Sequence, residues 1–317
     1  MAKSPYRVTA CERSPSFSPP IGNFMKVGLS IASASFESDP YVGAQSIIER
    51  AREANQVGLD LLSLGDHHLT PVNYFQNVPM LGRLLAEWQA GPVGCLFLLP
   101  LWNPVLVAEQ VGTLAALTKA TFVVQTGVGD GEETFKAMGA SMKTRGADLE
   151  KKIEIIKSLF AKSDSDLQVN PVPTQKIEWW IGASTSKEGI RRAARIGDAW
   201  YAAPFLNASK AGELLEYYLE ACECLDKKPR PIIRKDVIVL KDGRKAEELG
   251  DQLMEKGYRA MQRDAVIVGN PEQAAEQLRP YKELGFSEVT CRCMTIPQKE
   301  AIETISLLGE VRSLINN

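Results

Sequence analysis

The chain has 317 residues, of which 37 are Lys or Arg and 39 are Asp or Glu, so its formal net charge at pH 7 is −2. This near-neutral balance lacks the basic character needed to bind nucleic acid or an anionic membrane surface, and it predicts a small-molecule partner. With 44% hydrophobic and 24% charged residues, the composition is that of a folded globular protein and excludes disordered, collagen-like and coiled-coil chains.

The N-terminal segment, residues 1–24, contains four prolines and several serines but no apolar run that could form the core of a signal peptide. The longest apolar stretches, such as residues 93–102, are far shorter than the ~20 residues needed to span a bilayer. We therefore expect a flexible leader followed by one domain over residues 25–317, in a cytoplasmic protein without membrane contact.

From Met25 onward, short β-rich runs alternate with amphipathic helical stretches, which is the pattern of βα units around a parallel sheet. Strands are expected at 25–30, 61–64, 93–99, 122–126, 179–181, 199–202, 232–240 and 288–293. Helices are expected at 43–57, 79–87, 104–117, 145–161, 187–195, 209–225, 245–258, 271–284 and 298–314. Asn103 and Asn270 each precede a proline, which is typical of a helix start. Eight such units favour a single (β/α)8 TIM barrel, of class α/β, over an open doubly wound sheet.

Two motifs suggest other chemistries, but only weakly. Gly127-Val128-Gly129 follows a strand, yet no acidic residue ends a strand about 20 residues later, as the dinucleotide-binding fingerprint requires. Two Cys-x-Cys pairs, at 222/224 and 291/293, invite a zinc site. The first pair lies in a helical stretch, where residues two apart do not share a face, and the second lies in a strand. We expect reduced thiols that fill apolar space, and no metal site.

In a TIM barrel the active site lies where the strands end and the βα loops begin. The second strand is followed by Asp66, His67 and His68, and these are the only two histidines of the chain. An imidazole can donate a hydrogen bond or exchange a proton near neutral pH, so His67 is a candidate catalytic residue. The alternative interpretation is that the two histidines lie on the surface without a functional role, or make a capping contact.

The fourth strand is followed by a glycine-rich loop, Gly127-Val128-Gly129-Asp130-Gly131-Glu132. Its glycines let the backbone approach a planar ligand closely, and Glu132 can point into the mouth. Because strands two and four contribute to the same side-chain layer of a barrel, His67 and Glu132 could face one cavity. The alternative is a solvated carboxylate beside Glu133.

The fifth strand leads through Gly182-Ala183-Ser184-Thr185-Ser186 directly into a helix. Backbone amides at a helix N-terminus, together with three hydroxyl groups, can seat a phosphate. The stretch from Thr185 to Glu188 also has the pattern of a capping box, and a cap and a phosphate seat are compatible.

Taken in chain order, these segments resemble the bacterial luciferase-like monooxygenases and their relatives that use the deazaflavin F420. The resemblance extends from Met25 to about Asn317. Besides the loops already described, its marks are the segments 25–29, 99–104, 108–110, 180–184, 191–200 and 268–273.

The resemblance implies a barrel that binds reduced FMN or F420 at its C-terminal mouth, with the phosphate at Ser184, Thr185 and Ser186. It also implies a non-proline cis peptide at Leu96–Phe97, or at Cys95–Leu96. Leu98, Phe97 and Trp102 would form apolar walls. The cofactor-binding residues expected are Asp66, Leu96, Phe97, Gly127, Gly129, Gly131, Gly182, Ala183, Ser184, Thr185 and Ser186.

Two subfamilies fit different parts of the chain. Asp66-His67 and Gly129 to Glu132 resemble the F420-dependent dehydrogenases, in which the matching His and Glu serve hydride transfer. The doubled His67-His68 and the segment 99–104 resemble luciferase-type enzymes that use reduced FMN and O2. Many relatives carry a longer segment that forms a lid where this chain has the short, polar residues 161–178. A short segment encloses the substrate less well, which counts against oxygenase chemistry because that chemistry needs a site without water.

The leading interpretation is a monooxygenase that uses reduced FMN and O2 on a small organic substrate. In this enzyme His67 would be a proton donor and Glu132 a candidate acid. A separate flavin reductase and assembly as a homo-oligomer, a dimer, are the protein partners expected. The alternatives are F420-dependent hydride transfer and a non-catalytic flavin-binding barrel.

Overall fold

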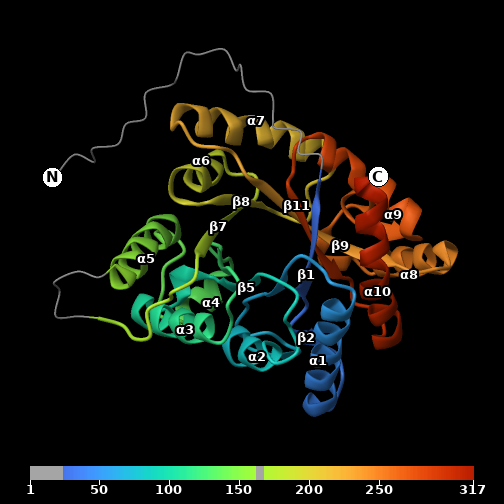
Figure 1. The fold of residues 1–317 in the computed structure, drawn as a ribbon, viewed down its shortest axis with the longest axis horizontal. Coiled ribbons are helices and arrows are strands. Elements are labelled where there is room, and N and C mark those ends of the chain that lie inside the picture. Colours follow the sequence, from blue (N-terminus) through green and yellow to red (C-terminus); the bar gives the residue numbers. More distant parts are fainter. Residues whose placement is uncertain (1–23, 162–167) are drawn as a thin grey trace.

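Eight parallel strands close into a barrel in the computed structural model, which describes residues 24–161 and 168–317 (Figure 1). Each strand pairs with the next along the chain, and β11 pairs with β1, so the expected (β/α)8 barrel is confirmed. The leader at 1–23 and residues 162–167 of the lid segment lie outside the described residues. The barrel strands are β1 (Lys26–Ile31), β3 (Leu62–Leu64), β5 (Val93–Phe97), β6 (Phe122–Thr126), β7 (Ile177–Ala183), β8 (Ala199–Ala202), β9 (Pro231–Val239) and β11 (Glu288–Cys293).

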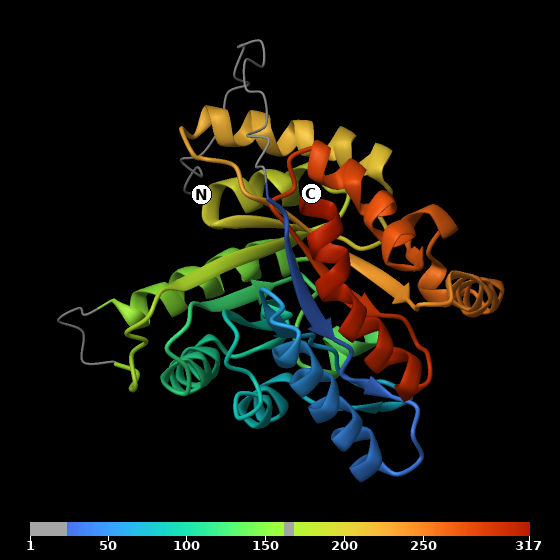
Figure 2. The same cartoon turned by 45° about the vertical axis from the view of Figure 1, so that its right-hand side comes forward.

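Helices surround the barrel on its outside (Figures 1 and 2). The Asn103 side chain accepts from the backbone N–H of Val105, and Asn270 forms a capping box with Gln273, so both expected helix starts are confirmed. The last helix lies along β1, where the Asn316 amide bonds the backbone N–H and C=O of Met25. The expected helices are α1 (Pro40–Gln56), α2 (Asn77–Leu84), α3 (Pro104–Ala116), α5 (Arg145–Phe160), α6 (Lys187–Ile196), α7 (Ala208–Cys224), α8 (Gly243–Glu255), α9 (Pro271–Glu283) and α10 (Gln298–Asn316).

Several short elements were not expected from the sequence. The pair β2 (Ala34–Ser35) and β4 (Asn73–Tyr74) is antiparallel, and β10 (Ile267–Gly269) extends the sheet beside β9. Such elements are too short to show a periodic hydrophobic pattern. The others are α4 (Glu132–Ala137) and the 3₁₀ turns η1 (Leu99–Leu101), η2 (Tyr258–Ala260) and η3 (Arg263–Ala265).

The end of β5 is regular, so the cis peptide expected at Leu96–Phe97 or Cys95–Leu96 is wrong. Within the described ranges the cis peptide bond lies at Asn170–Pro171. Leu96 and Phe97 continue the ladder with consecutive residues of β6, so no extra residue forms the expected bulge.

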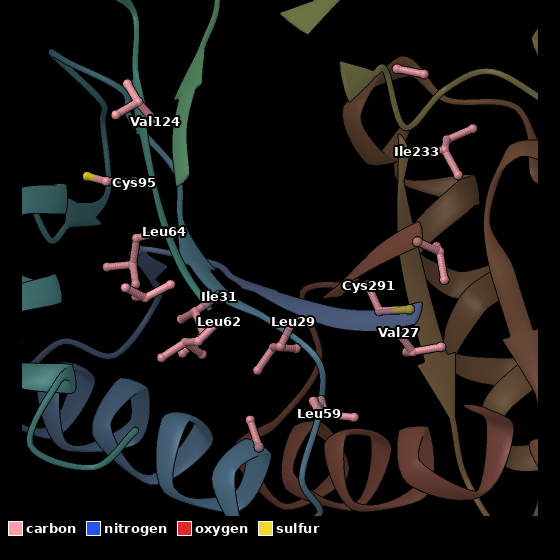
Figure 3. Packing of buried hydrophobic residues seen from close by; sticks show 14 of the residues in the cluster. Val27, Leu29, Ile31, Leu59, Leu62, Leu64, Cys95, Val124, Ile233 and Cys291 are labelled. Carbon is pink, nitrogen blue, oxygen red and sulfur yellow. The ribbon is translucent and has the colours of Figure 1, made fainter. Parts of the chain in front are cut away.

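The core has two apolar layers. Outward-facing strand residues, among them Leu29, Leu62 and Val124, pack toward the surrounding helices (Figure 3). Inside the barrel, a separate cluster contains the buried rings of Trp180 and Tyr201, whose centroids lie 5.8 Å apart. Because this cluster fills the interior, space for a ligand remains at the strand ends. The inner cluster consists of Leu61, Val123, Trp180, Ala199, Tyr201 and Ile232.

The Cys-x-Cys pairs are not arranged as metal sites. Cys222 is buried and Cys224 exposed on α7, and Cys291 and Cys293 are buried in β11. Burial raises the pKa of Cys293 to about 11, as expected for a protonated thiol among apolar neighbours. No three His, Cys, Asp or Glu side chains in the part of the chain that the structure describes are grouped to hold a metal ion. Nor is any helix there long and apolar enough to cross a membrane.

Close packing inside the barrel makes a prediction about Gly28 of β1. A Cβ on this residue would lie 2.8 Å from the Cβ of Leu61, so Gly28→Ala is expected to lower the free energy of unfolding by about 1–3 kcal/mol through overpacking. The control is Gly82→Ala in α2, where the nearest atom to the new Cβ is 3.8 Å away and alanine favours the helix. Urea unfolding of the three proteins measures the difference; equal midpoints for Gly28→Ala and wild type would contradict it.

Candidate functional site

Two adjoining cavities open at the carboxyl ends of the barrel strands, and Leu96 and Arg234 line both. The larger mouth cavity has a volume of about 710 Å³ and lies between the ends of β6, β7 and β8 and residues 142–147. The smaller mouth cavity, of about 380 Å³, lies between the ends of β1 and β3, the loop around Tyr74, and two further arginines. Both volumes are typical of small-molecule sites, which span roughly 300–1,000 Å³.

Asp66 lies two residues after the end of β3 and anchors the loop that follows β5. Its Oδ2 accepts hydrogen bonds from the backbone N–H of Leu98, at 2.8 Å, and from Nε1 of Trp102, at 2.7 Å. Its Oδ1 lies 3.3 Å from Nε2 of His68. Burial raises the pKa of Asp66, against the opposing effect of these donors. The carboxyl group is therefore largely committed to holding the mouth together.

The two histidines have different surroundings. His67 is exposed and lines the smaller mouth cavity. Its ring and the Tyr74 ring form a T-shaped pair with centroids 6.0 Å apart. Burial raises the pKa of Tyr74 to about 12, so its phenol is protonated at neutral pH and can donate a hydrogen bond. His68 instead contacts Asp66 and lies 5.7 Å from the Trp102 ring. Of the two, His67 is the one that lines a cavity.

The glycine loop after β6 does not bring Glu132 to the mouth. Gly129 and Gly131 have φ angles of 71° and 95°, and this turn leads into α4, which begins at Glu132. Because Phe135 of α4 is buried, the helix is fixed with Glu132 exposed, and Glu132 lines neither mouth cavity. The expectation that Glu132 points into the mouth and shares a cavity with His67 is therefore wrong.

The loop itself is tied down by Arg145. Its Nη1 donates to the carbonyl oxygen of Gly129 and to Oδ1 of Asp130, both at 3.1 Å. Arg145 also lines the larger mouth cavity. One guanidinium group therefore links the glycine loop to the cavity wall.

The expected phosphate seat lies at the edge of the larger mouth cavity. Ser184 and Ser186 line this cavity, and Ser186 caps α6, its Oγ accepting from the backbone N–H of Gly189 at 3.2 Å. Thr185 is exposed and does not line it. The expected Thr185–Glu188 capping box is therefore wrong, because the cap is one residue later and Glu188 pairs with Arg192 instead.

The other expected cofactor residues divide into two groups. Leu96, Gly127, Gly182 and Ala183 line the larger mouth cavity. A Cβ on Gly182 would lie 2.6 Å from the carbonyl oxygen of Thr126, so this strand junction requires glycine. Phe97 does not line the cavity, because alternation along β5 turns it outward against the Trp102 ring. Gly129 and Gly131 shape the loop without lining the cavity.

Three arginines of the smaller mouth cavity were not expected from the sequence: Arg234, Arg259 and Arg292. A signal was present for two of them. The charged run Arg234-Lys235-Asp236 interrupts an apolar strand, and Arg292 stands between two cysteines in another. Period-two alternation places Arg234, Asp236 and Arg292 on the inner face of the barrel and Lys235 on the outer face.

The larger mouth cavity fits a phosphorylated flavin. Oγ1 of Thr126 and Nε of Arg234 are buried without a hydrogen-bond partner, although such groups in proteins are almost always paired. Both residues line the cavity, as do the cationic side chains of Lys143, Arg145 and Arg192. Unpaired polar atoms, a wall with Gly127 and Gly182, and the N-terminus of α6 near cationic side chains meet the needs of a planar ring with a phosphate tail.

The sequence pattern of the luciferase-like monooxygenase family matches residues 25–260. The chain belongs to this family. The expected family membership is thereby confirmed. Members are oxidoreductases that depend on FMN or coenzyme F420, the two cofactors that the sequence led us to expect.

Related sequences include one that aligns over most of the chain. An F420-dependent glucose-6-phosphate dehydrogenase of Kribbella flavida is 22% identical over 298 residues, covering 77% of this chain and 87% of that protein. An uncharacterized protein of Mycobacterium tuberculosis is 33% identical over 112 residues, covering 32% of this chain. The match spans only 38% of the length of that relative.

Similar solved structures include enzymes of the same fold. A monooxygenase from Streptomyces bottropensis has a TM-score of 0.78 at 17% identity, covering 90% of this chain and 98% of its own. The FMN complex of the oxygenating constituent of 3,6-diketocamphane monooxygenase from Pseudomonas putida has a TM-score of 0.74 at 14% identity, covering 92% and 99%. At these identities the likeness establishes the fold.

The hydrogen bond from Trp102 to Asp66 makes a pH-dependent prediction. Trp102→Phe removes a donor to the ionised carboxylate, a bond that contributes about 1.5–3 kcal/mol to the free energy of unfolding. The folded-state pKa of Asp66 is already raised, and losing a donor to the charged form raises it further. The destabilisation should therefore be smaller where Asp66 is protonated, below its folded pKa, and grow as the pH rises through that value.

Urea unfolding at about pH 4 and about pH 8 measures this difference. The control is Trp88→Phe, because the Nε1 of Trp88 donates to the neutral carbonyl oxygens of Gly91 and Pro92. The decrease in the free energy of unfolding caused by Trp88→Phe should be the same at both pH values. A loss for Trp102→Phe that does not change with pH would show that Asp66 does not titrate as the structure indicates.

Proposed function

We propose that this protein is a monooxygenase that uses reduced FMN and O2 on a small organic substrate. The observation that carries the proposal is the larger mouth cavity, with its glycine wall, unpaired polar atoms, cationic side chains and the N-terminus of α6. The adjoining smaller mouth cavity would take the substrate, because it contains His67 and shares Leu96 and Arg234 with the cofactor cavity.

The residues of the larger mouth cavity have distinct roles in this proposal. Ser184 and Ser186, at the positive end of the α6 dipole, would bind the FMN phosphate. Gly127 and Gly182 leave room for the flat ring next to the backbone, with Leu96 as an apolar wall. When bound, reduced FMN would supply the electrons that activate O2 for transfer of one oxygen atom to the substrate.

His67 would hold and donate a proton in the smaller mouth cavity. Its ring is kept near the cavity by Tyr74, and the loop carrying Tyr74 pairs with Ala34 through β2 and β4. The described residues of the lid segment, 168–176, pack on α3 and not over the smaller cavity. There Val169 is buried, and Gln175 donates to the carbonyl oxygens of Ala115 and Thr118. Exclusion of water at the smaller cavity therefore falls to the β2–β4 pair.

The position of Glu132 supports FMN over F420. The F420 interpretation relied on a His and a Glu in one site, and Glu132 lies exposed outside both cavities. F420-dependent hydride transfer remains the second candidate, favoured by the Kribbella flavida relative that aligns over 77% of the chain. We further propose that a separate flavin reductase supplies reduced FMN, and that the enzyme works as a cytoplasmic homodimer.

Anaerobic titration with reduced FMN and reduced F420 in parallel tests the cofactor. We expect FMN to bind more tightly, and Ser184→Asp to weaken FMN binding by about tenfold or more, because a carboxylate would face the phosphate. Ser209→Asp is the matched control, because Ser209 lies exposed in the first turn of α7, away from the cavity. Equal loss of FMN and riboflavin affinity in Ser184→Asp would move the phosphate elsewhere, and tighter F420 binding would favour the second candidate.

Turnover of the His67 and Glu132 variants tests the chemistry. Loss of a general acid typically lowers the rate by about 10²–10⁴-fold, so His67→Ala should lower kcat by roughly 10²-fold with the fold intact. Glu132→Gln should leave kcat within about twofold of wild type, because an exposed carboxylate outside the mouth cannot reach the reacting atoms. A large loss for Glu132→Gln would instead support the F420 chemistry, and full activity of His67→Ala would exclude this mouth as the catalytic centre.

A further inference from the structure

We propose that the smaller mouth cavity selects a substrate with an oxyanion group, such as a carboxylate or sulfonate, bound by Arg234, Arg259 and Arg292. This inference rests on the proposed function, because it names the class of substrate that the cavity beside the flavin would take. Its support comes from the charge, position and backbone of these three residues.

The three arginines surround one buried carboxylate, that of Asp236. Its Oδ1 lies 3.9 Å from Nε of Arg234, and its Oδ2 lies 3.6 Å from Nε of Arg259 and 3.4 Å from Nη1 of Arg292. The Tyr258 hydroxyl also donates to Oδ2, at 2.9 Å. Three guanidinium groups against one carboxylate leave a surplus of two positive charges, and their fifteen or so N–H donors far exceed what one carboxylate can accept.

The other carboxylate of the cavity does not remove this surplus. Asp66 accepts from Leu98 and Trp102 and faces His68, and even when it is ionised the three arginines still exceed the two carboxylates by one charge. Arg234 and Arg292 are only 17% and 16% exposed as side chains, so bulk water screens them weakly. Arg234 also leaves its buried Nε without a hydrogen-bond partner. Partly buried, incompletely paired cations in a cavity are the arrangement that attracts an anionic ligand.

Arg259 is held toward the cavity by strained backbone. Arg259 and Ala260 have φ angles of 49° and 51°, which non-glycine residues rarely adopt. The preceding Gly257, at 74°, starts this turn, and η2 carries the Arg259 side chain to Asp236. Strain of this kind persists where the surroundings enforce it and is concentrated at ligand clamps. The Arg259 side chain is 40% exposed, so it lies on the open side of the arginine cluster.

The rest of the lining defines the body of the substrate. The cavity also has apolar lining residues, Ile31, Pro71, Val72 and Leu96. Because Leu96 and Arg234 also line the larger mouth cavity, a molecule anchored at the arginines extends its apolar part toward the flavin. The geometry therefore fits a small organic anion whose charged end is fixed and whose carbon body is oxidised.

Binding of matched probes to the cofactor-free protein tests this inference by calorimetry. The probes are 1-hexanesulfonate, hexanoate and the neutral 1-hexanol, which share one chain length and differ in the head group. We expect both anions to bind at least tenfold more tightly than 1-hexanol. Arg292→Met and Arg259→Met should each weaken anion binding by about tenfold while changing 1-hexanol binding little.

The control is Arg263→Met, because Arg263 pairs with Asp251 and Glu247 and does not line the cavity. It should bind all three probes as wild type does. Should Arg292→Met fail to fold, Arg259→Met at the exposed end of the cluster decides together with the wild-type selectivity. Equal binding of anions and 1-hexanol by wild type, or wild-type affinity for the anions in Arg259→Met, overturns the inference.

The same proteins separate this inference from the proposed function. Anion binding without any FMN binding would overturn the proposed function while leaving the anion site standing. FMN binding with no preference for anions would overturn only the substrate class. If FMN displaces 1-hexanesulfonate competitively, and riboflavin does not, the arginines bind the cofactor phosphate and the inference is wrong.

Discussion

Hydrogen bonding between β11 and β1, together with β8 and β9, closes the sheet, and every feature of the mouth depends on that closure. Closure aligns the carboxyl ends of all eight strands at one rim, so residues far apart in the chain become neighbours. His67 follows β3, Ser184 follows β7, and Arg292 lies near the end of β11. In an open sheet β11 and β1 would be separate edges, and Arg292 would not share a cavity with His67.

Two buried carboxylates at this rim have opposite surroundings. Asp66 receives donors from the protein itself and so holds the β5 loop in place. Asp236 is surrounded by more positive charge than it can neutralise. The mouth thus contains a structural anchor and a cationic cavity. The difference arises because Oδ2 of Asp66 accepts two hydrogen bonds from fixed donors, whereas Asp236 faces three arginines.

Parts of the mouth have backbone conformations that lower local stability. Glycine at 182 allows β6 and β7 to approach at the cofactor cavity, and Arg259 and Ala260 stay in a left-handed conformation beside the substrate cavity. Conformations of this kind are tolerated where a well-packed core supports them. The apolar cluster around Trp180 and Tyr201 lies beneath Gly182, and a separate buried cluster that contains Tyr258 and Met261 holds the turn at Arg259.

Local periodicity and capping residues determined much of this protein from the sequence alone. Alternating βα units gave the barrel, Asn103 and Asn270 gave helix starts, and position after a strand placed His67, Ser184 and Gly182 at the mouth. These signals are local, because each depends on residues within one element and its loop. Only the tertiary structure decided where three other side chains point. Glu132 is turned outward by the short helix α4, and Phe97 faces the outside of the barrel. Thr185 lies outside the cavity because the helix cap is Ser186, one residue later. The arginine cluster also depends on the tertiary structure. Arg234 and Arg292 meet because β9 pairs with β11, and a strained turn brings Arg259 to them. Pairing between strands that are distant in the chain leaves no local pattern in the sequence.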